Sequence, residues 1–323
     1  AGIVAAQRNN GEGVVGLAPG ARLMIVRVVD PYPRVCYSDV IAGVLYAVEE
    51  GAQIINLSLG GTTDSQALHD AMIYAANRDV LLVAATGNTG SGGTLYPARY
   101  NEVIAVNGTD KAEYVTGLWG PGLTVDLAAP SDDILTTWLQ TTQDYRSVSG
   151  TSFAAPHVTA AAALVRSLRP EVPAASIRHW LEANADDVNG DTWPGRDPFL
   201  GWGRLDLSRT LTAAAMGLRL TAEVANPSLP PGGSSTVWVT VQDEINRLVG
   251  SGVVIHFDTS LGLVTPTEAV TTQGIVTATL LAGTVAGTTV ITASLGTVTH
   301  TVAAVRIESD GTHRYHLPLV FAD

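Results

Sequence analysis

The stretch that most constrains the fold lies at residues 149–167, where Ser-Gly-Thr-Ser-Phe-Ala-Ala-Pro-His precedes a run of alanines. Alanine has the highest helix propensity, so a helix is expected to begin at or near Thr151 and Ser152. The first turn of a helix leaves backbone N–H groups without partners and carries the positive end of the helix dipole. The Ser152 hydroxyl is therefore either part of the cap of a buried helix or a nucleophile beside an anion site.

A resemblance to a known family favours the interpretation of Ser152 as a nucleophile. Residues 150–157, Gly-Thr-Ser-Phe-Ala-Ala-Pro-His, resemble the motif Gly-Thr-Ser-x-Ala-x-Pro-His of the subtilisin-like serine peptidases, which matches at seven specified positions. Ser152 falls on the nucleophile. His157 belongs to the same motif, but the resemblance gives it a structural place and not the role of catalytic base. Acyl transfer of this kind needs no cofactor for its chemistry.

Two further segments extend the resemblance. Residues 56–61, Asn-Leu-Ser-Leu-Gly-Gly, are similar to the edge that pairs with the substrate backbone in this family, while from the residues alone they form a strand that ends in a turn. The resemblance implies that Ser58, Leu59 and Gly60 bind substrate, because glycines allow an extended peptide to approach closely.

The second segment is residues 84–90, Ala-Ala-Thr-Gly-Asn-Thr-Gly, which resemble the segment that carries the family's oxyanion asparagine. The resemblance implies that Asn88 helps the Ser152 N–H to hold a tetrahedral oxyanion, although an asparagine between glycines is also an ordinary turn residue. It further implies that Ala85, Thr86 and Gly87 wall a specificity pocket. The family usually has alanine where Thr86 stands.

Apolar runs and helical patterns alternate through the first two thirds of the chain, which predicts an α/β fold with a parallel sheet and helices on both faces. The carboxyl ends of the strands are where such sheets bind ligands. The expected strands are Arg22–Val29, Gln53–Leu59, Val80–Ala85, the apolar run that ends at Val106, and Leu123–Leu127; the expected helices are 1–7, Asp39–Glu50 with Ser38 as cap, 64–78 with Asp64 as cap, and Ser176–Ala183.

The chain opens on Ala1-Gly2, which looks like the end of the family pattern His-Gly-Thr-x-Val-Ala-Gly. The resemblance implies that the catalytic histidine lies five positions before Ala1 and the catalytic aspartate further upstream. None of the seven histidines stands in a His-Gly-Thr context. We therefore expect an N-terminally truncated subtilisin-like domain over residues 1–215 that is inactive as given.

The composition changes after about Gly217 to segments rich in threonine, valine and glycine, which read as short strands and predict a β-sandwich over residues 217–307. Residues 252–257 and 272–278 resemble the bacterial immunoglobulin-like repeats of invasin- and intimin-type proteins, which implies contact with a cell surface or extracellular matrix. His256 is expected to face solvent. Residues 308–323, with His313 and His316, form a tail that is a polar linker, a sorting tail or a last strand. The expected strands are Arg219–Ala225, Ser235–Gln242, Gly252–Phe257, Gly274–Leu281, Gly287–Leu295 and Val298–Ile307.

Composition excludes several classes of function. The net charge of −12 argues against nucleic acid or an anionic membrane as a partner. No apolar run reaches the roughly 18 residues of a membrane span, and Cys36, the only cysteine, cannot form an internal disulfide. The turn at residues 9–13 resembles a calcium-binding loop of some members, in which Asn10 would supply an oxygen to a structural calcium ion; an ordinary turn is the alternative. No other metal ligands are identified.

The sequence is compatible with three functions. The first is a secreted, extracellular serine endopeptidase that acts on proteins or peptides through Ser152. The second is a catalytically inactive, peptidase-like surface binding or adhesion protein. The third, an α/β-hydrolase esterase, is disfavoured because Ser152 lacks the Gly-x-Ser-x-Gly elbow. The retention of the nucleophile and both oxyanion groups favours the first.

Overall fold

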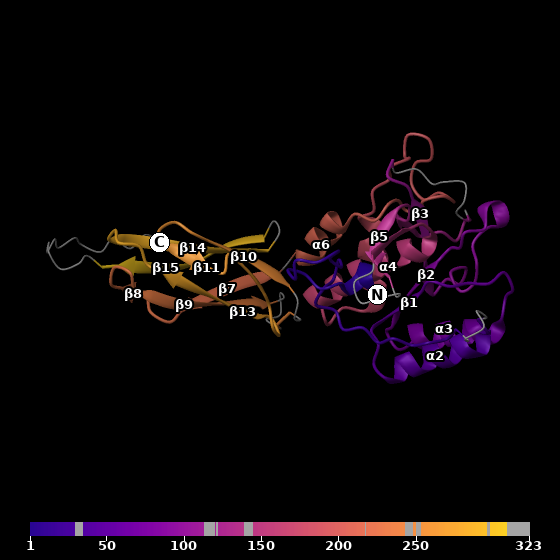
Figure 1. Cartoon of the computed structure of the whole chain (residues 1–323), viewed down its shortest axis with the longest axis horizontal. Coiled ribbons are helices and arrows are strands. Elements are labelled where there is room, and N and C mark those ends of the chain that lie inside the picture. Colours follow the sequence, from indigo (N-terminus) through magenta and orange to yellow (C-terminus); the bar gives the residue numbers. More distant parts are fainter. Residues whose placement is uncertain are drawn as a thin grey trace. The chain divides into compact units, whose positions relative to one another are not determined.

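The computed structural model describes residues 1–29, 35–112, 120, 122–138, 145–216, 218–242, 248–249, 253–295 and 298–308. The chain divides into two compact units, Ala1–Ala214 and Ala215–Asp323 (Figure 1). The first unit combines helices and strands around a parallel sheet, and the second is built from strands.

The sheet of the first unit consists of β1 (Ile54–Leu57), β2 (Leu81–Ala85), β3 (Val103–Thr109) and β4 (Leu127–Pro130), all parallel and paired in chain order. Every residue of β2 and β3 is buried. Burial on both faces explains why these strands are continuous apolar runs rather than alternating ones. The predicted α/β architecture with a parallel sheet is therefore confirmed.

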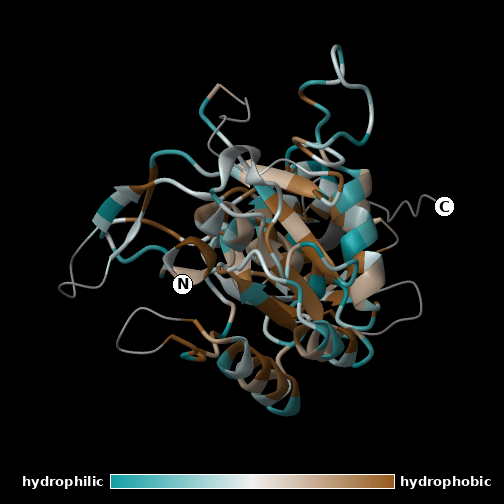
Figure 2. Ribbon diagram, turned by 90° about the vertical axis from the view of Figure 1, so that its right-hand side faces the viewer, coloured by the Kyte–Doolittle hydropathy of each residue, from teal (hydrophilic) through white to brown (hydrophobic). Residues whose placement is uncertain are grey.

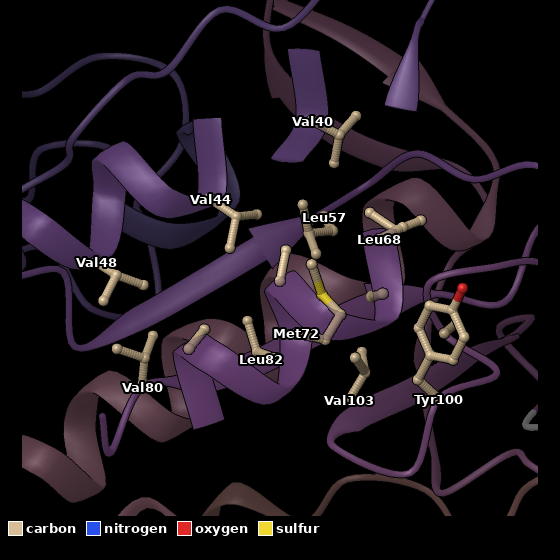
Figure 3. Close-up of a cluster of buried hydrophobic side chains, with 14 of the residues drawn as sticks. Val40, Val44, Val48, Leu57, Leu68, Met72, Val80, Leu82, Tyr100 and Val103 are labelled. Atoms are coloured by element: carbon tan, nitrogen blue, oxygen red, sulfur yellow. The ribbon is translucent and has the colours of Figure 1, made fainter. Parts of the chain in front are cut away.

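Helices cover both faces of this sheet. On one face, α2 (Tyr37–Glu49) and α3 (Gln66–Ala76) pack on alternate strand residues in one apolar cluster (Figure 3). On the other, α4 (Thr151–Leu168) contacts all four strands, and α5 (Ala174–Ala183) contacts α4. Figure 2 shows the apolar strands enclosed between these helices. The remaining elements of this unit are α1 (Gly2–Ala5), the 3₁₀ turn η1 (Gly90–Gly92), the antiparallel pair β5 (Ile134–Thr137) and β6 (Tyr145–Val148), and α6 (Leu207–Ala215), whose last residue falls in the second unit.

The prediction of a buried strand at Arg22–Val29 is wrong. The segment forms no regular strand, its described backbone pairing is the single antiparallel bridge of Val29 with Val35, and Leu23, Met24 and Ile25 are 44%, 41% and 77% exposed. Only part of it is covered: Val28 packs beneath α2, where a Cβ on Gly43 would lie 2.6 Å from its Cγ1. An apolar run can become a buried strand only where a neighbouring strand satisfies its backbone, and no such neighbour is present among the described residues.

Several predicted boundaries also shift. The helix expected after a Ser38 cap begins at Tyr37, with Cys36 as its N-cap. The next helix is capped by Ser65, whose Oγ accepts from the Leu68 N–H at 3.4 Å. Asp64 does not cap it, because its carboxylate accepts a hydrogen bond of 2.8 Å from the Tyr100 hydroxyl. The strand expected at residues 123–127 begins only at Leu127 and includes the residues expected to turn, up to Pro130.

The second unit contains two sheets, ordered β12-β10-β14-β15-β8 and β11-β13-β9-β7. All pairs are antiparallel except β8–β15. Burial alternates along the longer strands, as in a sheet with one face toward a core. All six predicted strands are present, and His256 is exposed as expected. The bounds are β7 Arg219–Val224, β8 Ser228–Leu229, β9 Ser234–Gln242, β10 Val254–Thr259, β11 Leu263–Thr265, β12 Glu268–Val270, β13 Ile275–Leu281, β14 Gly287–Leu295 and β15 Val298–Ile307.

A buried carboxylate ties the sheet of the first unit to its surroundings. Asp126, just before β4, has a side chain only 6% exposed. It accepts a hydrogen bond from the Ala105 N–H at 2.9 Å and pairs with Arg178 of α5 at 3.0 Å and Arg196 at 2.9 Å. Burial raises its pKa, and the Arg178 guanidinium opposes that shift. One side chain therefore links β3, α5 and the segment before α6.

We expect Asp126→Ala to lower the free energy of unfolding of the first unit by about 3 kcal/mol. This value is the lower end of the range for breaking a buried ion pair. We choose the lower end because Arg178 would still be paired with Glu182, at 2.6 Å, and would not be left as an unpaired charge. The measurement is urea unfolding followed by fluorescence. The control is Asp39→Ala, which removes an exposed carboxylate from the first turn of α2 and should cost less than about 1 kcal/mol. Equal losses in the two variants would contradict this assignment.

We also expect residues 215–323 to fold without the first unit, because their strands bury their own apolar residues, among them Val239, Ile255 and Ile291. Circular dichroism of this piece should show a β-rich spectrum and a cooperative thermal transition. An unfolded or helical spectrum would show that the boundary is misplaced.

Candidate functional site

The site begins at the N-terminus of α4, where the sequence predicts the helix start. Thr151 and Ser152 are the first two helical residues, and Gly150 is the N-cap. Gly150 has φ +145°, a conformation that residues with a side chain rarely adopt. Among the described residues, the Ser152 N–H has no backbone acceptor, as expected in a first helical turn. The helix therefore presents an unpaired donor beside the Ser152 hydroxyl.

The end of β1 is bonded directly to this turn. The Ser58 hydroxyl donates to the Ser152 carbonyl oxygen at 2.8 Å, and the Ser152 hydroxyl donates to the Ser58 carbonyl oxygen at 3.2 Å. Two residues that the sequence did not single out support this pair. Asn56 Nδ2 donates to the Ser58 hydroxyl at 2.9 Å, and the Thr159 hydroxyl of α4 donates to Asn56 Oδ1 at 2.9 Å. Asn56 opens the segment 56–61 that resembles the family's substrate-binding edge, whereas the only signal for Thr159 is its place two turns into α4.

The end of β2 is bonded to the same turn through Asn88. Its Oδ1 accepts from the N–H of Thr151 at 3.0 Å and from the hydroxyl of Thr151 at 3.1 Å. The Gly87 N–H in turn donates to the Thr151 hydroxyl at 3.1 Å. Because Oδ1 is occupied, Nδ2 is the free end of the amide, and no acceptor lies within hydrogen-bond distance of it in the described part of the chain. The structure thus brings Asn88 and Ser152 together with a free amide donor at the helix start.

Several side chains of the segments predicted to contact substrate are buried or packed inside the protein. Ala85 and Thr86 are buried, at 3% and 0% exposure. The Thr86 hydroxyl donates to Asn107 Oδ1 at 3.0 Å, so this side chain is bonded within the buried interior. Leu59 packs against the apolar cluster beneath α2 and α3. These segments therefore offer mainly backbone groups at the site, together with the glycines Gly60 and Gly87.

His157 is hydrogen-bonded within α4, to the carbonyl oxygen of the preceding turn. Its Nδ1 lies 2.7 Å from the Phe153 carbonyl oxygen, and since a carbonyl only accepts, Nδ1 carries the proton. Burial lowers the pKa of His157, and the bond to Phe153 partly opposes that effect. This arrangement agrees with a structural role for the histidine.

A cavity of about 540 Å³ opens beside Ser152. Ala1, Gly2 and Ile3 line one part of it, and Ser58 and Trp138 line another. None of its lining residues carries a carboxylate, imidazole or amine side chain. The described residues around this cavity therefore supply no side-chain base for the Ser152 hydroxyl.

The described residues contain no group of three or more His, Cys, Asp or Glu side chains arranged to hold a metal ion. Asn10 Oδ1 accepts from the Glu12 N–H at 3.0 Å, as in an ordinary turn. His313 and His316 lie outside the described residues. Within that part of the chain, no helix is long and apolar enough to span a bilayer.

The lowered pKa of His157 predicts how stability depends on pH. Below about pH 6.5 the unfolded chain binds a proton that the folded protein binds less readily, so stability is present above pH 6.5 and is lost as the pH falls. We expect His157→Asn, which keeps a donor for Phe153 but does not titrate, to reduce the slope of unfolding free energy between pH 6.5 and 5. The reduction is at most about 1.4 kcal/mol per pH unit.

Urea titrations of the first unit at several pH values test this. His256→Asn, in an exposed strand of the second unit, is the control and should leave the slope of the first unit unchanged. A slope in His157→Asn identical to that of the unaltered protein would contradict the prediction.

Comparisons with known proteins agree with this geometry. The profile of the subtilase family, peptidase S8, matches residues 1–203. Thermitase of Thermoactinomyces vulgaris is 41% identical over 190 residues, 59% of this chain and 67% of that protein. The thermophilic serine proteinase of Bacillus sp. (strain AK1) is 40% identical over 191 residues, 59% of this chain but only 46% of that protein. Subtilisin DY of Bacillus licheniformis is 36% identical over 200 residues, 61% of this chain and 72% of that protein.

This chain is also similar to a solved protease structure. A protease from Pseudoalteromonas arctica superposes with a TM-score of 0.59 at 27% identity, over 66% of this chain and 69% of that chain. The profile match covers more than half of the chain, and two of these relatives are named as a serine proteinase and as a subtilisin. The chain belongs to the subtilase family.

Proposed function

We propose that this chain is part of a secreted serine endopeptidase that hydrolyses peptide bonds through an acyl-enzyme on Ser152. The observation that carries the proposal is the position of Asn88, which is hydrogen-bonded to Thr151 next to Ser152 at the first turn of α4. The Asn88 carbonyl oxygen is occupied by Thr151, so its amide nitrogen is free for an oxyanion. The names of two similar proteins as a serine proteinase and a protease support peptides or proteins as substrates.

The reaction follows from these groups. The Ser152 Oγ attacks the scissile carbonyl carbon and loses its proton to a base, while the Ser152 N–H and Asn88 Nδ2 donate to the developing oxyanion. The proton then passes to the leaving amine as the C–N bond breaks, which leaves an ester on Ser152. Water attacks that ester by the same steps and releases the acid. None of these steps requires a metal or cofactor.

The base is proposed to lie ahead of Ala1, as the resemblance implies, with a histidine oriented by an aspartate further upstream. Two observations support this. The cavity that adjoins Ser152 is lined by Ala1–Ile3 and has no side-chain base. The apolar segment Arg22–Val29 is bridged only at Val29, to Val35, and β1 pairs with only β2 among the described strands, which fits a sheet that lacks strands.

Substrate is proposed to bind as an extended peptide along Ser58–Gly60 and beside Ala85–Gly87. The two segments leave the parallel neighbours β1 and β2 at the same edge, since Leu57 pairs with Ala84. Main-chain pairing with a peptide is the usual mode of binding at such an edge. The second unit is proposed to be an immunoglobulin-like module for extracellular contacts. Its two β-sheets, one of five strands and one of four, support this proposal.

The test of the nucleophile is Ser152→Ala in the protein extended upstream. We expect loss of peptide hydrolysis to the background rate, because the neighbouring hydroxyl at the helix start, on Thr151, is buried and bonded to Asn88. Casein and a chromogenic peptide are suitable substrates. Turnover by the variant equal to that of the unaltered protein would exclude Ser152 as the nucleophile.

The test of the oxyanion donor is Asn88→Ala. We expect kcat to fall by about 10²–10³, a magnitude taken from the equivalent donor in subtilisin rather than calculated from this structure. The Michaelis constant should change by less than about threefold, since the donor acts mainly in the transition state. Asn101→Ala, which removes an exposed asparagine elsewhere, is the control. A fall in kcat of less than about threefold would remove Asn88 from the oxyanion site.

A further inference from the structure

One outer face of the second unit carries a tryptophan in its middle. The strands β13 and β9 are the two central strands of the sheet β11-β13-β9-β7 (Figure 1). Side chains alternate along both strands, so that every second residue points away from the core. Trp238 of β9 points outward and is 38% exposed, although large aromatic side chains normally stabilise a protein by being buried. We call this outward side of the sheet the Trp238 face.

Threonines surround the tryptophan on this face. Thr277 of β13 lies directly opposite Trp238, and five more threonines lie in the neighbouring rows of all four strands. Within the described part of the chain, neither their six hydroxyls nor the indole N–H is hydrogen-bonded to another protein group. The face therefore offers hydrogen-bond donors and acceptors to a ligand. The six threonines are Thr221, Thr236, Thr240, Thr265, Thr277 and Thr279.

The charge of the face points to a neutral ligand. The strands β11, β13 and β9 contain no charged residue. Arg219 and Glu223, of opposite sign, are exposed on the edge strand β7. Residues 215–323 contain four arginines and no lysine, against eight aspartates and glutamates. A phosphate, sulfate or uronate polymer would require a cluster of basic side chains, which these strands lack.

The distribution of apolar residues argues against a protein partner. Leu263 and Leu281 face each other at one end of the face, and Ile275 lies toward the other end of β13, with threonines between. The core of a protein interface is usually a continuous apolar patch. An apolar partner would bury the threonine hydroxyls without hydrogen-bond partners, which is costly. A ligand that itself carries many hydroxyl groups avoids this cost.

We propose that the Trp238 face binds a neutral β-1,4-linked polysaccharide, of the chemical class of cellulose or chitin. The sugar rings of such a chain have flat faces of C–H groups and carry their polar substituents around the rim. A ring face packs on the exposed indole of Trp238, and the rim groups exchange hydrogen bonds with the threonine hydroxyls in place of water.

The size of the face fits a chain of sugars better than a single sugar. The stretch of β9 from Thr236 to Thr240 spans about 14 Å, and the four strands together span a similar width of about 14 Å. Several rings of an extended chain can therefore contact the threonine rows at once. Binding requires neither Ser152 nor any residue of the first unit, so it is independent of the proposed catalysis.

The test is a depletion assay, in which the 323-residue chain is mixed with microcrystalline cellulose or with chitin and the unbound protein is measured. We expect saturable binding to at least one of the two. Trp238→Ala should weaken it by at least about tenfold. Thr277→Val, which removes one hydroxyl and keeps the shape, should weaken it by about two- to tenfold. Trp202→Ala removes a tryptophan of the first unit that is 44% exposed, and this control should bind like the unaltered protein.

Absence of binding to both polymers would overturn the proposal, as would retention on heparin resin with no binding to either neutral polymer. Equal binding by the unaltered protein and by a folded Trp238→Ala variant would place the polysaccharide elsewhere. If circular dichroism shows that Trp238→Ala is unfolded, Thr277→Val decides instead, and unchanged binding by that variant would contradict the proposal. A dimer that Trp238→Ala dissociates, seen by sedimentation without polysaccharide binding, would make a second copy the occupant and would also overturn it.

Discussion

The site depends on one set of contacts, the hydrogen bonds that tie the first turn of α4 to the ends of β1 and β2. Ser58 and Ser152 each donate to the other's carbonyl oxygen, and Asn88 receives both the N–H and the hydroxyl of Thr151. These bonds join segments 63 to 94 residues apart in the chain. They fix Ser152 and Asn88, the proposed nucleophile and oxyanion donor, relative to each other before any ligand binds, which is the preorganisation that electrostatic catalysis requires.

The geometry of these contacts depends on the rigidity of the parallel sheet, because the strands β1 and β2 lead directly into the bonded segments. The strands β2 and β3 are buried on both faces, and α4 packs across all four strands. Polar groups beneath the site are paired with one another. Thr86 bonds to Asn107, whose Nδ2 donates to the Phe199 carbonyl oxygen at 2.8 Å. Because a buried polar group without a partner is costly, this chain of bonds holds the segment beside Asn88 in one position.

Local pattern was sufficient to predict the strands at Val80–Ala85 and Gly287–Leu295 and the start of α4, because burial or alternation and propensity agree there. It was insufficient for Arg22–Val29, since an apolar run does not say whether a partner strand exists. The two predicted helix caps were misplaced by one or two residues. For α3, Asp64 and Ser65 are both good capping residues, and Asp64 is engaged by the Tyr100 hydroxyl, which leaves Ser65 as the cap. The motifs predict Ser58, Asn88 and Ser152 as site residues, and the structure brings these three together. The bond between Asn56 and Thr159 joins distant segments, and no local signal encodes it.

The central claim is that Ser152 is a nucleophile preorganised by Asn88 whose base comes from residues ahead of Ala1. The most direct measurement is the rate of covalent labelling by a fluorophosphonate, with the modified residue located by peptide mass spectrometry, in the 323-residue chain and in the same chain extended upstream. We expect labelling at Ser152 in the extended protein and labelling at least about a hundredfold slower in the shorter chain. Equal rates in the two proteins, or labelling at a different residue, would contradict it.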